Sequence, residues 1–556
     1  METVSFDIFD TCLVRKCGDP QNLLDILAWH VFKEQVSDTT RKEFVMARRM
    51  ADLNTYDNPF AKLSDIYDAL HYSHPLLKDK TQLSKIEQDL ERQMLVPIPK
   101  MLNLTNQLRE NGCRIVFVSD MYLSADFLAD ILREAGLMQD GDKLYVSCEV
   151  GKRKADGELF KFIQAKENIR YRDWTHYGDN LKSDYQVPRS LGITAKRLEW
   201  GYTPYQNAWY TQNYDPGNRI AETLAGVCRC LHYTLQDSPH KDFLLDLASP
   251  MFVVFTYRVM RRAQSEGIKR LYFCARDAKL CFLIAELLKS LFAGLSVHYL
   301  YISRDALYNG NSVARMKYFE QCGLAAKKEK CAIVDLRTTG KTMMLLNEQL
   351  QEAGYQQVAG FFFEMFCTRK MDYIPSNYYA ELLSPYYTQI SSCLPAFAHY
   401  NLIEKYISLH NDARTIDYAV VDGKASPVFA DRQTESPDEN AIIQDVDQRC
   451  IEHREVTLAF TRMFIECELY RSANTVFDVA IRSWMNFTKY PERYYLQALT
   501  DFYTCKPKSD VVLPYVRKMG VLELLCTRGN NTIWRKASIV YSLPEWLGYI
   551  YKRKKC

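Results

Sequence analysis

Short apolar runs alternate with amphipathic stretches over the first 200 residues. The run VSFDIFD starts at Val4 and the run CRIVFVSD starts at Cys113, and each one ends in acidic or hydroxyl side chains. From 20 to 110, apolar residues recur at i, i+3 and i+4 spacing, which predicts helices. Later strand-like and helix-like stretches alternate, which is typical of a parallel sheet covered by helices. We therefore predict an α/β domain over 1–200, with a helical cap of about 14–100 inserted after the first strand.

A second α/β pattern follows farther along the chain. Its strand-like runs are IKRLYFCARD, VHYLYISRD, KCAIVDLRTTG and VAGFFFEMF, and helix-like stretches separate them. We predict a second α/β domain over 265–370, preceded by a helical connector over 205–265. Residues 371–556 read as a mixed, mainly helical C-terminal region. The chain as a whole is therefore expected to belong to the α/β class.

The charge balance narrows the classes of partner. The chain has 71 basic and 68 acidic residues, a net charge of +3, and the basic residues form no localised stripe. A nucleic-acid-binding domain would show a clear basic excess or such a stripe. We therefore expect no nucleic-acid partner.

The same sequence argues for a cytoplasmic protein without a transmembrane segment. Three acidic residues, Glu2, Asp7 and Asp10, interrupt the N-terminal apolar stretch, which a signal peptide would not tolerate. No run approaches the roughly 20 consecutive apolar residues that a membrane span needs, and arginines break the most apolar stretch, 251–263. The 17 cysteines are scattered without a CxxC pair, as expected of reduced thiols.

Polar side chains follow the predicted strands of the first domain, at the points where the apolar runs stop. They are Asp7, Thr11, Ser119, Lys154, Asp179 and Asp184. Since parallel sheets bind ligands at the carboxyl ends of their strands, we expect these groups to meet. Together they supply a carboxylate that can attack phosphorus, a hydroxyl and an ammonium that can hold phosphoryl oxygens, and an acidic pair that can anchor Mg²⁺.

In this order and spacing, the motifs DIFDT, VSD, GKRKADGELF and GDNLKSD resemble those of the haloacid dehalogenase (HAD) superfamily. Most members of that superfamily are Mg²⁺-dependent phosphatases built on a Rossmann-like sheet. The resemblance implies that Asp7 is the nucleophile that forms an aspartyl-phosphate and that Thr11 supports the turn of its motif. It also implies that Ser119 binds the phosphoryl group and that Lys154 neutralises it.

The resemblance implies a Mg²⁺ cofactor as well. Asp7, the backbone carbonyl of Phe9 and Asp179 would bind the metal, and Asp184 would bind it directly or lie in the next layer around it. The helical insertion after the first strand would be the mobile cap of this superfamily, which excludes water and shapes the choice of substrate.

One position departs from the phosphatase pattern. Two residues after the nucleophile, these phosphatases carry a second Asp that protonates the leaving oxygen, and here that residue is Phe9. The neighbouring Asp10 is displaced by one position, which on a strand directs a side chain to the opposite face. Dehalogenases also carry an aromatic residue at this position. They need no Mg²⁺, however, so the presence of the candidate Mg²⁺ ligands Asp179 and Asp184 favours phosphoryl chemistry here. A good leaving group, a proton from the substrate or a repositioned Asp10 could compensate for the missing proton donor.

The second domain contains the run AIVDLRTTGKT, in which a strand leads through a glycine-containing loop into a helix. Such a loop favours a phosphate. A P-loop would require glycine at Asp335, so that motif fails. The run resembles type I phosphoribosyltransferases at Asp335, Thr339, Gly340 and Thr342, and Lys341 lies within it. Leu336 replaces the second acid that holds the ribose hydroxyls in that group.

Two earlier strands of the second domain end alike, in Arg276-Asp277 and Arg304-Asp305. Each pair could be a local salt bridge. Alternatively, both pairs could meet Asp335 at the same edge of the sheet and bind a ligand.

The chain ends in WLGYIYKRKKC, with basic residues Lys552, Arg553, Lys554 and Lys555. A solvated basic end is one interpretation. Peripheral contact with an anionic membrane surface is the other, because aromatic and basic side chains suit that interface.

The leading functional hypothesis is a bacterial, Mg²⁺-dependent HAD phosphohydrolase that acts on a small phosphorylated metabolite, a sugar or nucleotide derivative. A HAD unit followed by such a second domain also resembles bacterial proteins of surface-polysaccharide or stress-response gene clusters, which suggests a role in surface-polysaccharide biosynthesis. Two alternatives stay open. One is a glycosyl or phosphoribosyl transferase centred on the second domain, and the other is a non-catalytic ligand sensor.

Overall fold

The structure is a computed structural model of the chain. It describes residues 2–77, 79–212, 219–325, 327, 329–367, 376–385, 401–431, 442–443, 446–505, 511–520, 523–524 and 531–553. The chain divides into two compact units. The first comprises Met1–Gln236 with Cys467–Leu469, and the second comprises Asp237–Glu466 with Tyr470–Cys556.

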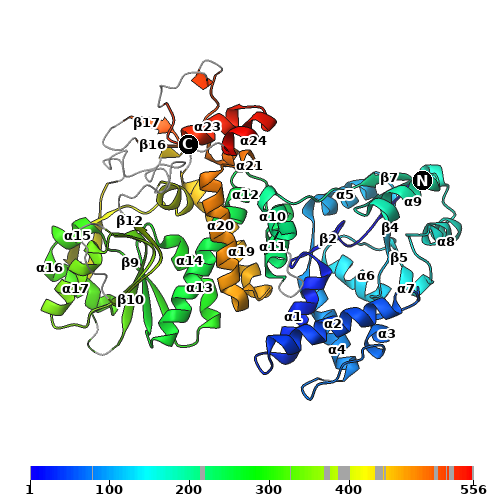
Figure 1. Ribbon diagram of the computed structural model, residues 1–556, viewed down its shortest axis with the longest axis horizontal. Coiled ribbons are helices and arrows are strands. Elements are labelled where there is room, and N and C mark those ends of the chain that lie inside the picture. Colours follow the sequence, from blue (N-terminus) through cyan, green and yellow to red (C-terminus); the bar gives the residue numbers. More distant parts are fainter. Residues whose placement is uncertain are drawn as a thin grey trace. The chain divides into compact units, whose positions relative to one another are not determined.

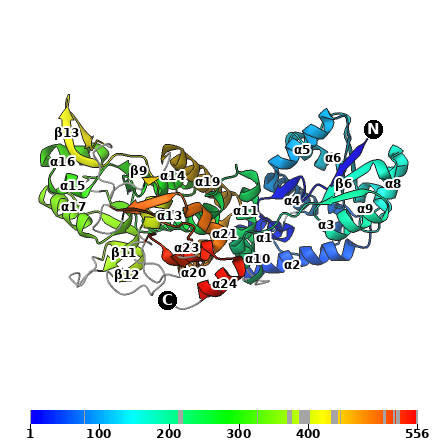
Figure 2. The same cartoon turned by 90° about the horizontal axis from the view of Figure 1, so that it is seen from above.

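A five-stranded parallel sheet forms the centre of the first unit. Its strands are β1 (Thr3–Phe6), β4 (Arg114–Ser119), β5 (Lys143–Val146), β6 (Trp174–Gly178) and β7 (Thr194–Arg197). They lie in the order β5-β4-β1-β6-β7, and every neighbouring pair is parallel. Figures 1 and 2 show strands of this sheet among the blue and cyan helices of the first unit. The predicted α/β sheet is therefore confirmed, with the first strand at its centre.

Helices connect these strands and bury their apolar side chains. They are α5 (Pro99–Glu110), α6 (Ala125–Glu134), α7 (Ser147–Val150), α8 (Glu158–Glu167), η1 (Tyr171–Asp173), η2 (Leu181–Gln186) and α9 (Val187–Ser190). One core cluster joins Val116 and Val118 of β4 to Leu159, Phe160 and Ile163 of α8. Because both faces of a parallel sheet are covered, its strands read as nearly continuous apolar runs.

The helical insertion lies between β1 and β4. A short antiparallel pair, β2 (Leu13–Arg15) with β3 (Leu95–Pro97), joins it to the sheet. Between these strands run α1 (Pro20–Phe32), α2 (Asp38–Thr55), α3 (Leu63–Asp68) and α4 (Lys80–Met94), drawn in blue in Figure 1. We call α1–α4 the cap.

The segment expected as a helical connector, 205–265, is helical but is divided between the two units. Helices α10 (Pro204–Gln212) and α11 (Ile220–Thr234) belong to the first unit, and α12 (Lys241–Phe243), η3 (Leu244–Ala248) and α13 (Ser249–Ser265) belong to the second. Helix α11 touches the loop after β2 at two glycines, because a Cβ on Gly226 would lie 2.5 Å from the Cα of Gly18.

A second five-stranded parallel sheet forms the centre of the second unit. Its strands are β8 (Arg270–Cys274), β9 (Ser296–Leu300), β10 (Cys331–Thr338), β11 (Ala359–Cys367) and β12 (Tyr378–Pro385), in the order β12-β11-β10-β8-β9. The helices α14 (Lys279–Leu288), η4 (Lys289–Leu291), α15 (Arg304–Tyr308), α16 (Ser312–Cys322) and α17 (Lys341–Glu352) connect the strands. The chain moves outward in opposite directions from β8, so the strand order reverses between β8 and β10.

The rest of the second unit contains both helices and small antiparallel sheets. The helices are η5 (Asn401–Ile407), α19 (Val446–Glu466), α20 (Ala473–Lys489), α21 (Arg493–Leu496), η7 (Gln497–Leu499), α23 (Arg535–Ser542) and α24 (Glu545–Arg553), with η6 (Leu469–Ser472) at the boundary of the units. The strands are the hairpin β13 (Thr415–Val421) with β14 (Lys424–Phe429), and β15 (Ile442–Ile443), β16 (Phe502–Cys505) and β17 (Val512–Pro514).

One continuous helical stretch, Lys241–Ser265, is long and apolar enough to cross a membrane by length and composition. Its most apolar 18-residue window is 94% buried inside the structure, which is how the core helix of a globular domain packs.

The basic C-terminal residues lie partly outside the described residues, so the interpretation as a membrane contact stays a prediction. Helix α24 ends at Arg553, and Lys554 and Lys555 lie beyond the described part.

Candidate active site

The nucleophile candidate Asp7 lies at the carboxyl end of the central strand. Its backbone N–H donates to the carbonyl of Tyr177 at 2.8 Å, which extends the β1–β6 pairing. On the other side, Phe6 of β1 pairs with Phe117 of β4, and β4 ends two residues later at Ser119. Asp179 directly follows β6. Three adjacent strands therefore deliver Asp7, Ser119 and Asp179 to one edge of the sheet, as the sequence predicted.

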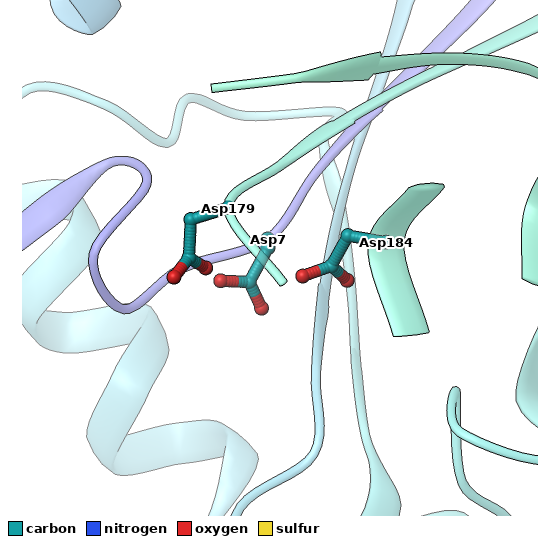
Figure 3. A group of neighbouring side chains, drawn as sticks. All are labelled: Asp7, Asp179 and Asp184. Carbon is teal, nitrogen blue, oxygen red and sulfur yellow. The ribbon is translucent and has the colours of Figure 1, made fainter. Parts of the chain in front are cut away.

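Three carboxylates meet at this edge. Asp7, Asp179 and Asp184 each offer one oxygen, and these oxygens lie within 4.8 Å of one another. Figure 3 shows the three side chains directed toward a common centre from separate parts of the chain. Asp7 and Asp184 are buried, whereas Asp179 is partly exposed. Three hard oxygen donors at this spacing suit Mg²⁺.

Lys154 links two of these carboxylates. Its Nζ lies 2.5 Å from Oδ1 of Asp7 and 2.7 Å from Oδ1 of Asp184, and the lysine is only 3% exposed. Asp120 fixes the lysine in place, because its carboxylate accepts a hydrogen bond from the Lys154 backbone N–H at 2.9 Å. The sequence did not single out Asp120, although it directly follows Ser119.

Burial and the neighbouring charges shift the pKa values of these carboxylates. Burial raises the pKa of Asp7 to about 8, although Lys154 opposes this rise, and the neighbouring Asp184 and Asp179 add to it. Burial also raises the pKa of Asp179 to about 6, with Asp10 and Asp184 contributing. Burial opposes ionisation of Asp184 too, but Lys154 and His176 hold its pKa below the ordinary range. A divalent cation would relieve this repulsion.

A buried chain of hydrogen bonds supports Asp184 from beneath. The Trp174 indole N–H donates to Ser5 Oγ at 2.8 Å, and Ser5 Oγ lies 2.7 Å from His176 Nδ1. His176 Nε2 lies 3.2 Å from Asp184 Oδ1. Because Ser5 Oγ already accepts from Trp174, its proton points to Nδ1, so Nε2 carries the ring proton and donates to Asp184. Burial lowers the pKa of His176, which favours this neutral form.

The GDN stretch has a steric explanation. A Cβ on Gly178 would lie 2.5 Å from Cγ of Asp184, so only glycine lets the carboxylate approach the strand end. Asn180 caps the turn that follows, since its side chain accepts from the N–H groups of Lys182 and Ser183, both at 3.0 Å. The Asn180 N–H donates to Asp184 Oδ2 at 3.1 Å. This turn therefore determines where Asp184 points.

Phe9, the position that departs from the phosphatase pattern, lies against the guanidinium of Arg15. The Arg15 guanidinium carbon lies 4.4 Å from the centre of its ring. Arg15 in turn donates to Glu91 of cap helix α4, from Nε at 2.8 Å and from Nη2 at 2.5 Å. The aromatic ring is thus part of a contact that reaches from the motif to the cap.

Asp10 does not supply the missing proton in this geometry. It has a positive φ of 50°, and its Oδ1 lies 3.0 Å from Nη1 of Arg229 on helix α11. In the structure this oxygen is engaged in an ion pair with the guanidinium. The interpretation of a repositioned Asp10 as the general acid is therefore not supported. Arg229 is a residue that the sequence did not single out, since its position follows from the contact of Gly226 with Gly18.

Thr11 lies in the turn that follows the nucleophile. That turn is closed by backbone hydrogen bonds, from Cys12 N and Leu13 N to Ile8 O, both at 2.9 Å. Thr11 Oγ1 is buried and has no hydrogen-bond partner among the described residues. The hydroxyl itself therefore does not hold the turn.

The predicted ligand residues of the second unit separate into two groups. Arg276 and Asp277 lie two and three residues beyond the end of β8, which neighbours the strand that carries Asp335. Arg304 and Asp305 instead open helix α15, where Asp305 pairs with Arg414 at 2.7 Å. Asp305 of the second pair is therefore held in an ion pair with a residue far along the chain, and a ligand site shared with Asp335 stays a prediction.

The glycine loop of the second unit follows a long strand. The apolar run stops at Asp335, but β10 continues to Thr338, because this part still pairs with β11. Thr339 and Gly340 form the turn, and Gly340 has a φ of +81° and caps helix α17, which starts with Lys341 and Thr342. The Gly340 N–H donates to Thr338 Oγ1 at 2.9 Å.

No known protein family matches the chain, and no curated protein matches it. Several solved structures are similar to part of it. A HAD-family enzyme from Bacteroides thetaiotaomicron is 15% identical, covers 39% of this chain and 99% of that chain, and has a TM-score of 0.29. The L-2-haloacid dehalogenase from Xanthobacter autotrophicus is 14% identical, covers 40% of this chain and 87% of that chain, and has a TM-score of 0.30. A HAD phosphatase from Thermococcus onnurineus is 18% identical, covers 36% and 87%, and has a TM-score of 0.28.

At this distance the likeness assigns neither a reaction nor a substrate to this chain. None of these three structures covers more than 40% of it, and none is a phosphoribosyltransferase. The resemblance of the second unit to that group therefore stays a prediction. The function of the first unit has to be inferred from the geometry of its site.

Gly178→Ala is expected to destabilise the protein by about 1–3 kcal/mol, because the added methyl group overlaps Asp184. Gly201→Ala is the matched control, since a Cβ there meets nothing within 4 Å. Chemical denaturation measures both changes. Equal stability of the two variants would show that Asp184 does not depend on the close approach to Gly178.

Asp7→Asn is expected to raise the melting temperature in EDTA, and more so at pH 8 than at pH 5. The pKa of Asp7 rises on folding from 3.8 to about 8, so the folded chain holds a proton that the unfolded chain releases. Asp7 therefore costs increasing stability as pH rises through this window, on the order of 1 kcal/mol or more by pH 8. Melting curves at both pH values test this. A variant less stable than the parent at pH 8 would contradict it.

Proposed function

We propose that the first unit is a Mg²⁺-dependent phosphohydrolase of the HAD type, which acts on a small phosphorylated metabolite through an aspartyl-phosphate on Asp7. One observation carries the proposal. A buried carboxylate lies 2.5 Å from a buried lysine and within 4.8 Å of two further carboxylates, all at the carboxyl edge of a parallel sheet. A structural ion pair would need one acid for one base, whereas this arrangement leaves excess negative charge.

The residues present fit a magnesium ion. Asp7, Asp179 and Asp184 would hold it, together with the backbone carbonyl of Phe9, because all are oxygen donors. Burial raises the pKa values of Asp7 and Asp179, and neighbouring carboxylates add to the rise, so a cation bound there would favour the ionised forms. The ion would offset the charge on the phosphoryl group and on the attacking carboxylate.

The side chains then divide the remaining work. The Asp7 carboxylate attacks phosphorus, the bond from phosphorus to the leaving oxygen breaks, and an aspartyl-phosphate forms. Lys154 lies beside Asp7 and offsets the charge of the phosphoryl oxygens, and the Ser119 hydroxyl donates to one of them. Water then attacks the aspartyl-phosphate, which releases phosphate and regenerates Asp7.

The leaving oxygen lacks a protein proton donor at the usual position. Phe9 has no proton to give, and Asp10 is engaged in an ion pair with Arg229. General acid catalysis contributes roughly 10²–10⁴ in rate, so substrates whose leaving group needs no proton should be strongly favoured. Acyl phosphates, aryl phosphates and glycosyl phosphates belong to this class.

We further propose a sugar or nucleotide derivative as the substrate, a cytoplasmic location and a role in the biosynthesis of a bacterial surface polysaccharide. The nearly balanced charge of the chain supports a small-molecule partner rather than a nucleic acid. The cap, inserted directly after the nucleophile motif, supports a substrate small enough to be enclosed.

Asp7→Asn is expected to lower phosphate release by at least about 10³-fold, because the amide cannot form the covalent intermediate. Asp140→Asn, at an exposed acid of the same unit, is expected to leave the rate unchanged. The assay uses a panel of phosphorylated metabolites with Mg²⁺ and with EDTA. Phosphate release that survives Asp7→Asn would refute the proposal, and no turnover of any compound would favour the ligand-sensor alternative.

The parent enzyme is expected to show a steep dependence of kcat/KM on the pKa of the leaving group. Phe9→Asp should reduce that dependence, because an acid at this position can protonate the leaving oxygen, and alkyl phosphates should gain about 10-fold or more. A series of aryl and alkyl phosphates measures both slopes, and the melting temperature reports whether losing the contact with Arg15 unfolds the variant. A parent enzyme that hydrolyses alkyl and aryl phosphates equally fast would contradict this expectation.

A further inference from the structure

We infer that helix α24 lies on the surface of an anionic membrane and attaches the second unit to it. The helix comprises the nine residues Glu545–Arg553. It is therefore roughly 14 Å long, about half the thickness of the hydrocarbon core of a bilayer, so it can lie along a membrane but cannot span one. This inference does not depend on the reaction proposed for the first unit.

One side of α24 is fixed against the neighbouring helix α23, and Figure 1 shows both helices in red. Gly548 is buried on this side, and a Cβ there would lie 3.2 Å from the backbone oxygen of Val540 in α23. The glycine thus lets the two helices approach closely. The contact determines which side of α24 faces the protein and which side faces away from it.

The side that faces away carries large apolar side chains. Trp546 and Ile550 stand two positions before and two positions after Gly548, which at about 100° per residue places them on the opposite side of the helix. Trp546 is 66% exposed and Ile550 is 52% exposed, and Tyr549 between them is 47% exposed. Such a face gains free energy when a second apolar phase covers it.

Basic residues accompany this apolar face. From 545 to 556, Glu545 is the only acid, and the four basic residues are Lys552, Arg553, Lys554 and Lys555. At the other end of the helix, the exposed Arg493 donates from Nη1 to the carbonyl of Leu543 at 2.7 Å, which brings a further positive charge to the start of α24. Anionic lipid headgroups attract such cations, while the apolar side chains enter the boundary between headgroups and acyl chains.

The same charges disfavour a second copy of this chain as the partner. A symmetric dimer would bring the same face of two chains together. Because basic residues outnumber acidic ones four to one over 545–556, such a contact would place like charges next to each other. An anionic bilayer instead offers the opposite charge and an apolar layer at once.

The test measures how the full chain co-sediments with vesicles of phosphatidylcholine alone and of an equimolar mixture of phosphatidylcholine and phosphatidylglycerol. We expect at least about 10-fold stronger binding to the mixed vesicles, and added salt should weaken it. Trp546→Ser combined with Ile550→Ser should weaken it by about 10-fold or more, because the apolar anchors are lost. Exchanging the four basic residues of 552–555 for glutamine should weaken it by about 10-fold or more as well.

Val313→Ser combined with Ile451→Ser is the matched control. These residues are 76% and 46% exposed on α16 and α19 of the same unit, so their exchange should leave vesicle binding unchanged. Circular dichroism and melting temperature show whether each variant folds, and the glutamine variant leaves the apolar face intact.

Two results would overturn the inference directly. One is the absence of binding to the mixed vesicles, and the other is binding that neither the serine nor the glutamine variant weakens. Sedimentation velocity adds a third readout. A dimer of the parent chain that Trp546→Ser with Ile550→Ser dissociates, without vesicle binding by the parent, would assign the face to a second copy and overturn the inference too.

Discussion

The buried lysine between two aspartates is the interaction on which the first unit's site depends. Lys154 Nζ contacts Asp7 at 2.5 Å and Asp184 at 2.7 Å, and all three groups are removed from water. Burying several carboxylates with a single cation is costly, and such an arrangement persists only where the surrounding structure fixes it. The Asp120 carboxylate fixes the backbone of the lysine, and the turn after Gly178 fixes Asp184. The excess negative charge that remains would attract a cation to this edge.

Hydrogen bonds between side chains inside the sheet also support that site. Ser5 and His176 are paired neighbours on β1 and β6, and their side chains meet inside a core that is otherwise apolar. Each polar group in this chain has a partner, from the Trp174 indole to the Asp184 carboxylate, so the network adds order without an unpaired buried atom. The sheet therefore controls both the position and the protonation state of the side chains at its edge.

The sequence predicted the first sheet and the residues at its edge because both depend on local pattern. An apolar run followed by Asp7, Ser119 or Asp179 identifies a strand end, and strand ends of one parallel sheet meet. The sequence did not predict Arg229 or Glu91, because their contacts with Asp10 and Arg15 join positions far apart in the chain. In the second unit, the apolar run stops at Asp335 but the strand continues, since pairing with β11 extends it beyond its apolar residues.

Phe9 and Asp10, two and three residues after Asp7, explain how the site can differ from the phosphatase pattern and stay ordered. Phe9 lies against Arg15, which is paired with Glu91 of the cap, and Asp10 is paired with Arg229 of α11. An acid in place of Phe9 would lie next to the Arg15 guanidinium, which already donates to Glu91. The substitution would therefore change two contacts, that of position 9 with Arg15 and that of Arg15 with Glu91. The region where a leaving group would lie is thus connected to the cap and to α11 by arginines. The side chain at position 9 and the cap are therefore linked, because Arg15 contacts both Phe9 and Glu91.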